Sequence, residues 1–158
     1  MQVIEITVYT FDELNDKAKE RARDWWRSVE EFPWFGEYRD SLKAFCDKFG
    51  IRVTDYHLSA DYRASVDTNV MPSHFRGLKL KEIRRDEMPT GFCADCSLMF
   101  EFYDQFKKTG DAKYAFEQAI QQFLIDLRRD IESTYEDEYI DEMLTANAYT
   151  FTEDGKRF

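Results

Sequence analysis

The chain has few of the residues that build catalytic and phosphate-binding sites. Its 158 residues include two His, three Cys, six Gly and three Pro. Such a small supply leaves little from which to assemble a catalytic triad, a closed metal site or a glycine-rich phosphate loop. An odd number of cysteines is also unlike a disulfide framework and favours a reducing compartment. We therefore expect no cofactor, no metal site and a cytoplasmic location.

Long apolar runs are lacking as well. The N-terminal stretch MQVIEITVYT is apolar only in alternation, has no basic flank and leads directly into charged sequence. This pattern predicts neither a signal peptide nor a membrane span, and no later stretch has the length of a transmembrane helix. We expect no membrane association.

Negative charge and aromatic side chains are abundant. There are 32 acidic and 22 basic residues, which give a formal net charge of -10, and 16% of the residues are aromatic. A hydrophobic fraction of 43% exceeds that of disordered acidic chains, so the charge must cover a folded core. The length predicts one domain that spans residues 1–158.

Two helices are predicted in the first third of the chain. Asn15 is a suitable N-cap, and apolar residues after it recur at helical spacing, which predicts a helix from about Asp16 to Glu30. Pro33 ends this pattern. Helical spacing resumes from Trp34 to Phe49, and Gly50 supplies the expected terminating residue. Together these helices would form an antiparallel hairpin.

Strands are predicted where the apolar period changes to two. The first covers Val3 to Tyr9, a hairpin follows from Ile51–Tyr56 and Tyr62–Val70, and a last strand lies within Asn147–Phe158. In the last segment Asp154-Gly155 favours a tight turn. We expect these strands to form one sheet.

The second half of the chain is mainly helical. Met71–Gly91 has two prolines and a charged middle and is expected to be an irregular excursion of the chain that connects the sheet to the helical half. A helix is predicted over Cys96–Lys108 with Gly110 after it, and a main core helix of about 24 residues begins near Asp111. The fold class is therefore α+β, a small antiparallel sheet of about four strands packed against four helices.

The cysteines and histidines give only weak evidence for a zinc site or a redox pair. Cys93 and Cys96 form a Cys-x-x-Cys pair, and the residues that could complete a zinc site from a distance are Cys46, His57 and His74. A structural zinc site usually has a second close pair of ligands, and a redox pair usually follows a thioredoxin-like βαβ pattern. We favour small buried residues at a helix start for this pair, with zinc binding and redox chemistry as alternatives.

Carboxylates on the predicted strands leave hydrolase chemistry open. Glu5, Asp55, Asp61 and Asp67 lie on or near strands without a decisive pattern. Catalytic carboxylate pairs need environments that separate their pKa values, which a sequence does not reveal. A small hydrolase that depends on carboxylates or on the cysteine pair is therefore kept as an alternative.

Nucleic-acid binding is not favoured. Trp25, Trp26 and Trp34 could stack on bases, but base stacking is expected beside a basic groove, so core packing is the better interpretation. The basic residues cluster only briefly, at Lys79, Lys81, Arg84 and Arg85. A polyanion would be repelled by the net charge, and we expect no direct binding of nucleic acid.

The densest acidic segment covers residues 126–142. It has eight acidic residues against Arg128 and Arg129 in a region that we expect to be helical. Carboxylates along a helix can imitate nucleic-acid phosphates toward a basic cleft, and the alternative is a solvated face that keeps the protein soluble. The candidate partner-binding residues are Asp130, Glu132, Glu136, Asp137, Glu138, Asp141 and Glu142.

A resemblance to a known family rests on the stretches VYTFDELNDKAKERARDWWR and YIDEMLTANAYTFTEDGKRF, residues 8–27 and 139–158. These resemble the two ends of a family of small accessory proteins encoded by bacteriophages and prophages, sometimes labelled antitoxin-like. The resemblance implies a phage-encoded protein in the cytoplasm of a bacterial host. The expected function is stoichiometric inhibition of a basic bacterial protein, from a defence or nucleic-acid-processing system. An antitoxin that neutralises a basic toxin is the alternative.

Overall fold

The chain forms two compact units in the computed structural model, which describes residues 5–58 and 63–158. The terminal unit consists of residues 1–32 and 132–158, and the central unit consists of residues 33–131. Each unit has hydrophobic side chains of its own buried within it. That the whole chain unfolds as one domain stays a prediction.

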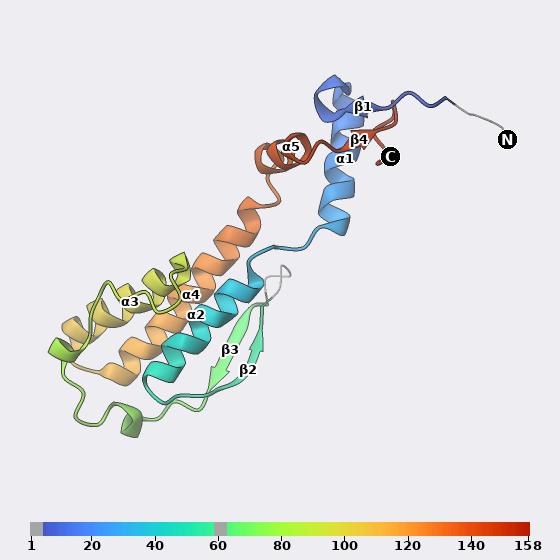
Figure 1. Ribbon diagram of the computed structural model, residues 1–158. Helices are drawn as coiled ribbons and strands as arrows, with labels where there is room; N and C mark the ends of the chain where they lie inside the picture. Colours follow the sequence, from blue (N-terminus) through green and yellow to red (C-terminus); the bar gives the residue numbers. More distant parts are fainter. Residues whose placement is uncertain (1–4, 59–62) are drawn as a thin grey trace. The chain divides into compact units, whose positions relative to one another are not determined.

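The terminal unit brings the two ends of the chain together (Figure 1). Its elements are β1 (Tyr9–Thr10), η1 (Phe11–Glu13), α1 (Asp16–Val29), α5 (Asp137–Ala146) and β4 (Thr150–Phe151). β1 and β4 pair antiparallel, with Tyr9 opposite Phe151. The side chain of Asn15 accepts a hydrogen bond of 3.0 Å from the Ala18 amide, which confirms the predicted N-cap of α1.

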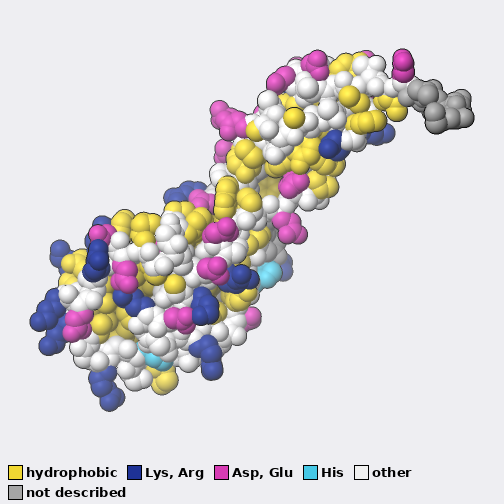
Figure 2. Space-filling model, viewed as in Figure 1, with side chains coloured by type: hydrophobic (Ala, Val, Ile, Leu, Met, Phe, Trp, Pro, Cys, Tyr) yellow, Lys and Arg dark blue, Asp and Glu magenta, His cyan; other side chains and the backbone are white. Residues whose placement is uncertain are grey.

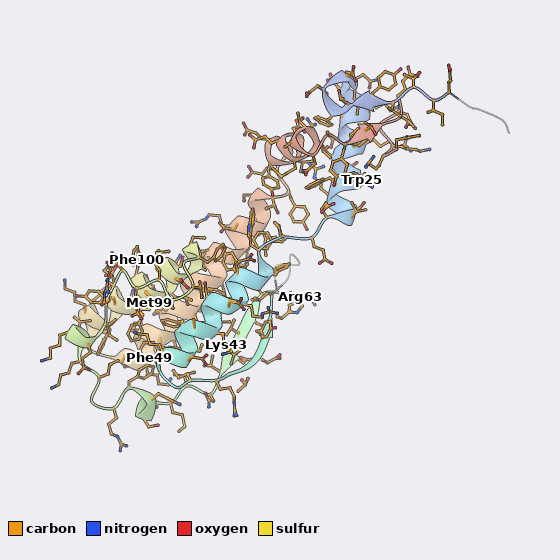
Figure 3. All side chains as sticks on the ribbon, in the orientation of Figure 1. Trp25, Lys43, Phe49, Arg63, Met99 and Phe100 are labelled. Atoms are coloured by element: carbon orange, nitrogen blue, oxygen red, sulfur yellow. The ribbon has the colours of Figure 1, made fainter. Side chains whose placement is uncertain are left out.

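The core of the terminal unit combines small residues of α1 with aromatic rings. Its buried residues are Phe11, Leu14, Ala18, Ala22, Ile140, Leu144 and Phe151. Trp25 packs edge-on against Tyr149 at 5.4 Å and Phe151 at 6.3 Å between ring centroids, and Trp26 contacts Tyr149 at 6.0 Å. Figure 3 labels Trp25 on α1 among these side chains. Both tryptophans therefore serve packing, as predicted.

A tight turn follows β4. The Thr152 amide donates to the Lys156 carbonyl and the Gly155 amide donates to the Thr152 carbonyl, each at 2.9 Å. Gly155 has a φ of +83°, and a Cβ there would lie 2.1 Å from the Ala18 carbonyl oxygen. This position therefore requires glycine, both for the backbone conformation and for close contact with α1, and the turn predicted at Asp154-Gly155 is confirmed.

The central unit consists of three helices and a β-hairpin. Its elements are α2 (Phe35–Lys48), β2 (Val53–His57), β3 (Ser65–Thr68), η2 (Pro72–Phe75), η3 (Leu80–Glu82), α3 (Cys93–Thr109) and α4 (Ala112–Ser133, which continues two residues beyond the unit). Gly50 and Gly110, with φ values of +65° and +70°, follow α2 and α3 as predicted. The segment 71–91 has only short 3-10 turns, in agreement with the expected excursion.

Phenylalanine rings from all three helices form the central core. Phe45 of α2 lies 6.0 Å from Phe102 of α3 and 5.2 Å from Phe116 of α4, between ring centroids. Phe49 lies 4.7 Å from Phe102, and Phe75 of the excursion lies 5.4 Å from Phe49. These rings are almost fully buried, so they fix the packing of α2, α3 and α4.

The predicted sheet of about four strands is wrong in its connectivity. The described residues contain two separate two-stranded antiparallel sheets, β1–β4 in the terminal unit and β2–β3 in the central unit. The predicted N-terminal strand is reduced to Tyr9–Thr10, because Ile6 and Val8 are exposed and outside the ladder. Val3, Ile4 and Tyr62, which were assigned to strands, lie outside the described residues. The class α+β is confirmed.

Five α-helices, and not four, occur in the described residues. The helical region near the C-terminus is divided, because α4 ends at Ser133 and α5 begins at Asp137. Glu136 has an extended backbone, and Asp137 and Glu138 occupy the first turn of α5, where negative charge interacts favourably with the helix dipole. Among the helices that the structure describes, we find no segment with the length and apolarity needed to cross a membrane.

Candidate acidic interface

The acidic segment 126–142 does not form one continuous row of charge. Asp126 and Asp130 lie on α4 within the central unit, whereas the acids from Glu132 onward belong to the terminal unit. Residues 134–136 separate α4 from α5 within the segment. The segment that we expect to be helical is thus divided between α4 and α5.

Asp126 and Asp130, both on α4, have partners inside the protein. Asp126 is 8% exposed, accepts a 3.1 Å hydrogen bond from Gln122 and lies 3.1 Å from Arg129. Asp130 accepts a hydrogen bond from the Tyr38 hydroxyl. Burial of the ring, together with this bond, raises the pKa of Tyr38 well above its ordinary value. Asp130 is thus a structural acceptor in the central unit.

Asp137 and Asp141 hold α5 to α1. The Arg23 guanidinium donates two hydrogen bonds to the Asp141 carboxylate, at 2.7 and 2.8 Å, and these raise the pKa of Arg23. Arg27 donates to Asp137 and, at 3.3 Å, to the carbonyl of Tyr135. A bidentate pair such as that of Arg23 with Asp141 is the strongest that arginine forms with a carboxylate. Both aspartates therefore have a structural role.

Four of the candidate residues remain directed to solvent. Glu132, Glu136, Glu138 and Glu142 are exposed, and within residues 5–58 and 63–158 none has a basic group within 4 Å. Glu138 and Glu142 are four positions apart on α5, so they lie on the same face of the helix. These four glutamates are the part of the candidate set that can meet a partner.

The acidic charge of the protein is concentrated in the terminal unit. That unit has 16 acidic and 7 basic residues, and the central unit has 16 and 15, which give net charges of -9 and -1. On the face drawn in Figure 2, Lys and Arg side chains gather over the central unit, whereas the terminal unit shows mainly acidic and hydrophobic side chains. The candidate glutamates thus belong to a wider acidic surface.

Basic residues of α1 offset this charge poorly at the surface. The side chains of Arg23 and Arg27 are only 18% and 27% exposed, whereas those of Glu20, Asp24 and Asp137 around them are 53%, 68% and 54% exposed. These two guanidinium groups are largely covered and the carboxylates around them face outward, whereas Lys17 and Arg21 of the same helix are exposed. An approaching molecule therefore meets the acids first.

The cysteine pair shows no sign of activation. Cys93 is exposed at the first position of α3 and Cys96 is half-buried, so the expectation that both are buried is wrong for Cys93. Partial burial of the sulfur, followed by the charge of Asp130, raises the pKa of Cys93. A raised pKa disfavours the thiolate, which is the reactive form.

The other candidate side chains are dispersed. His57 is exposed on β2, and His74 caps a local turn, where its Nδ1 lies 3.0 Å from the Met71 amide. In the described ranges, no three His, Cys, Asp or Glu side chains come together to hold a metal ion. Asp55 and Asp67 are cross-strand neighbours in the β2–β3 hairpin, Glu5 is exposed before β1, and Asp61 lies outside the described residues.

The short basic cluster is partly neutralised within the central unit. Arg85 donates two 2.9 Å hydrogen bonds to Asp104, and its guanidinium lies 4.2 Å from the ring centroid of Phe100. Arg84 lies 3.5 Å from Asp86. Lys79 and Lys81 are exposed. The cluster is therefore no extended cationic surface for nucleic acid.

Comparison of the chain with protein families, with curated proteins and with solved structures finds no match. The resemblance of the two ends to a phage-encoded family stays a prediction.

Sequence reasoning missed a pocket in the central unit that is bordered by Arg39, Lys43 and Arg52. The spacing of Arg39 and Lys43, four positions apart on a predicted helix, indicates that both lie on one face. Their proximity to Arg52 follows only from the position of β2 beside α2.

Proposed function

We propose that this chain is a phage-encoded acidic binding protein. It inhibits a basic bacterial protein of a defence or nucleic-acid-processing system by stoichiometric contact, and its terminal unit acts as a mimic of nucleic-acid charge. The observation that carries the proposal is the net charge of -9 in the terminal unit against -1 in the central unit. The phage origin and the bacterial target rest on the resemblance of residues 8–27 and 139–158.

The contact surface is centred on the exposed glutamates of the terminal unit, Glu132, Glu136, Glu138 and Glu142. Within residues 5–58 and 63–158 their carboxylates have no basic group within 4 Å, so a basic protein can meet them without breaking the α1–α5 contact. Long-range attraction of this kind accelerates association and weakens as salt rises, because charges are screened beyond about 10 Å at 0.1 M ionic strength.

Affinity capture from a bacterial lysate tests the proposal. The bait is compared with a variant in which Glu132, Glu136, Glu138 and Glu142 are replaced by Gln. We expect one basic protein to be retained by the unchanged chain in 0.05 M salt, and lost both in 0.5 M salt and with the variant. Asp137 and Asp141 are left unchanged because Arg23 and Arg27 depend on them.

A matched control removes four charges from the central unit by Glu37→Gln, Asp40→Asn, Asp55→Asn and Asp67→Asn. This control should retain the partner, and its association rate with the purified partner should equal that of the unchanged chain. Equal loss in both variants would show that only total charge matters, and unchanged capture by the Gln variant would exclude the glutamate surface. Mass spectrometry of the captured protein separates a nucleic-acid-processing enzyme from a basic toxin.

A further inference from the structure

The central unit contains a pocket between α2 and β2 that the acidic surface does not involve. Its volume is about 610 Å³, which lies within the range of small-molecule sites. Among the residues that the structure describes, those that line it all fall between Arg39 and Tyr56. This part of the lining therefore comes from one continuous stretch of chain within one unit.

The floor of the pocket is apolar and belongs to the core. Leu42, Cys46 and Ile51 line it and are 1%, 1% and 2% exposed. Burial raises the pKa of Cys46 to about 12, so its thiol is neutral and behaves as a small apolar group. Because these side chains are fixed by packing on their other sides, the floor is preformed.

The rim of the pocket is basic. Arg39, Lys43 and Arg52 border it, and Asp47 is the acidic residue among the lining residues that the structure describes, so this described lining has a net charge of +2. Figure 3 labels Lys43 on α2. In a protein with a net charge of -10, three cations beside an apolar cavity form a local site for negative charge.

The three cations differ in whether they are already paired with a carboxylate of the protein. Lys43 donates a 2.6 Å hydrogen bond to Asp47, and Arg39 lies 3.6 Å from Asp40. For Arg52 no carboxylate lies within 4 Å in the described residues, while its backbone amide is held by Asn69 at 2.8 Å. Arg52 thus has a positioned backbone and a guanidinium available to an incoming anion.

Tyr56 adds an aromatic surface to the same pocket. It lies on β2 and is 45% exposed, which is high for a large aromatic side chain. A tyrosine ring offers area for contact with an apolar or aromatic group at low cost in conformational entropy. The lining therefore presents an apolar floor, a ring and cations at the entrance.

We infer that this pocket binds a small amphipathic anion. The ligand has one carboxylate, sulfonate or phosphate group, which pairs with Arg52 and the neighbouring cations, and an aromatic or aliphatic part that covers the floor. This inference is independent of the acidic surface of the terminal unit.

The test uses two fluorescent probes that differ chiefly in charge. These are 8-anilinonaphthalene-1-sulfonate and the uncharged N-phenyl-1-naphthylamine, each titrated into the full chain and followed by fluorescence and calorimetry. We expect saturable binding of one sulfonate probe per chain, at least tenfold tighter than the uncharged probe. Near-UV circular dichroism must show native packing, because loosely packed states also bind the sulfonate probe.

Variants locate the binding. Arg52→Gln should weaken the sulfonate probe at least tenfold, and Val53→Glu, which places a carboxylate in the pocket, should abolish binding. The control Arg76→Gln removes an exposed cation of the same unit outside the pocket and should change nothing. Failure of Arg52→Gln to weaken binding, or equal weakening by Arg76→Gln, would overturn the inference, as would the absence of saturable binding.

Competition identifies the chemistry of the ligand. Millimolar decanoate and millimolar phenyl phosphate are each added to the complex with the sulfonate probe. Displacement by decanoate alone indicates an aliphatic carboxylate, and displacement by phenyl phosphate alone indicates an aromatic phosphate. If neither displaces the probe, the pocket has no general affinity for amphipathic anions and the inference is wrong. Equal binding of both fluorescent probes would instead indicate an apolar surface for a protein partner.

Discussion

The terminal and central units have the same number of acidic residues, 16 each, but 7 and 15 basic residues. The strong negative charge of the terminal unit therefore comes from its small number of basic residues and not from additional acidic residues. In that unit Arg23 and Arg27 are drawn into the contact between α1 and α5. A count of acids along the chain is thus a poor guide to where a protein is negative, since the position of the cations decides it.

The two units also differ in what holds their helices. Rings of Phe45, Phe102 and Phe116 join the three helices of the central unit. In the terminal unit, α1 and α5 meet through small or aliphatic residues and are tied by arginine–aspartate pairs. Ion pairs consequently help to hold the helices together in the terminal unit, whereas apolar packing dominates in the central unit. Three substitutions sharpen this contrast.

The largest effect is expected from Phe102→Ala in the central core. Phe102 is fully buried among other rings, so the cavity should lower the free energy of unfolding by about 3–5 kcal/mol. Denaturant unfolding measures it, with Tyr114→Ala, an aromatic residue that is 41% exposed on α4, as a near-neutral control. Since one domain is predicted, hydrogen exchange should increase in both units. Protection retained in the terminal unit alone would show that the units fold separately.

A smaller but selective effect is expected from Gly155→Ala in the terminal unit. Left-handed backbone costs a non-glycine residue about 1–2 kcal/mol, and contact of the new Cβ with the Ala18 backbone adds to this. The control is Gly110→Ala, which has φ of +70° but no atom within 4 Å of the added Cβ. Thermal unfolding should show a clearly greater loss for position 155. Equal losses would mean that the turn moves away from α1 at no cost.

The smallest effect separates structural from exposed carboxylates. Asp141→Asn removes the partner of the Arg23 guanidinium and should cost about 1 kcal/mol, whereas Glu142→Gln, one residue further on, should stay within about 0.5 kcal/mol. A double-mutant cycle of Asp141→Asn with Arg23→Gln should recover most of that cost as coupling. If the coupling is zero, α1 and α5 are held by apolar contacts alone.

Local pattern was enough to predict most of the helices. The spacing of apolar residues placed α1 and α2 within about two residues of their observed bounds. Asn15 marked the start of α1, and Gly50 and Gly110 marked the ends of α2 and α3. A helix cap or a left-handed glycine acts within one turn of backbone, so neighbouring residues contain the information. The length predicted for the main core helix placed its end near that of α4, but α5 was not predicted as a separate helix, because Thr134 to Glu136 lack the proline or glycine that usually separates two helices.

In the β2–β3 hairpin, a local irregularity in register changes the regular alternation of side chains along the strand. Strict alternation predicts that Val53 and Tyr56 point to opposite faces of β2, yet both line the same pocket. The register of β2 against β3 shifts between Val53 and Asp55. A bulge inserts an extra residue into one strand and so changes which side chains share a face. The basic pocket could therefore not be predicted from the alternation.

The sequence by itself determined the class of the fold, the net charge, the cap at Asn15 and the turn at Gly155, because each depends on composition or on a few adjacent residues. Only the tertiary structure decided that β1 pairs with β4, that Arg23 neutralises Asp141, and that Arg52 lies beside α2. The first two contacts join residues far apart along the chain, and the third depends on how β2 packs beside α2. Their free energy depends on distance and burial in the folded protein, and neither quantity is present in the order of the residues.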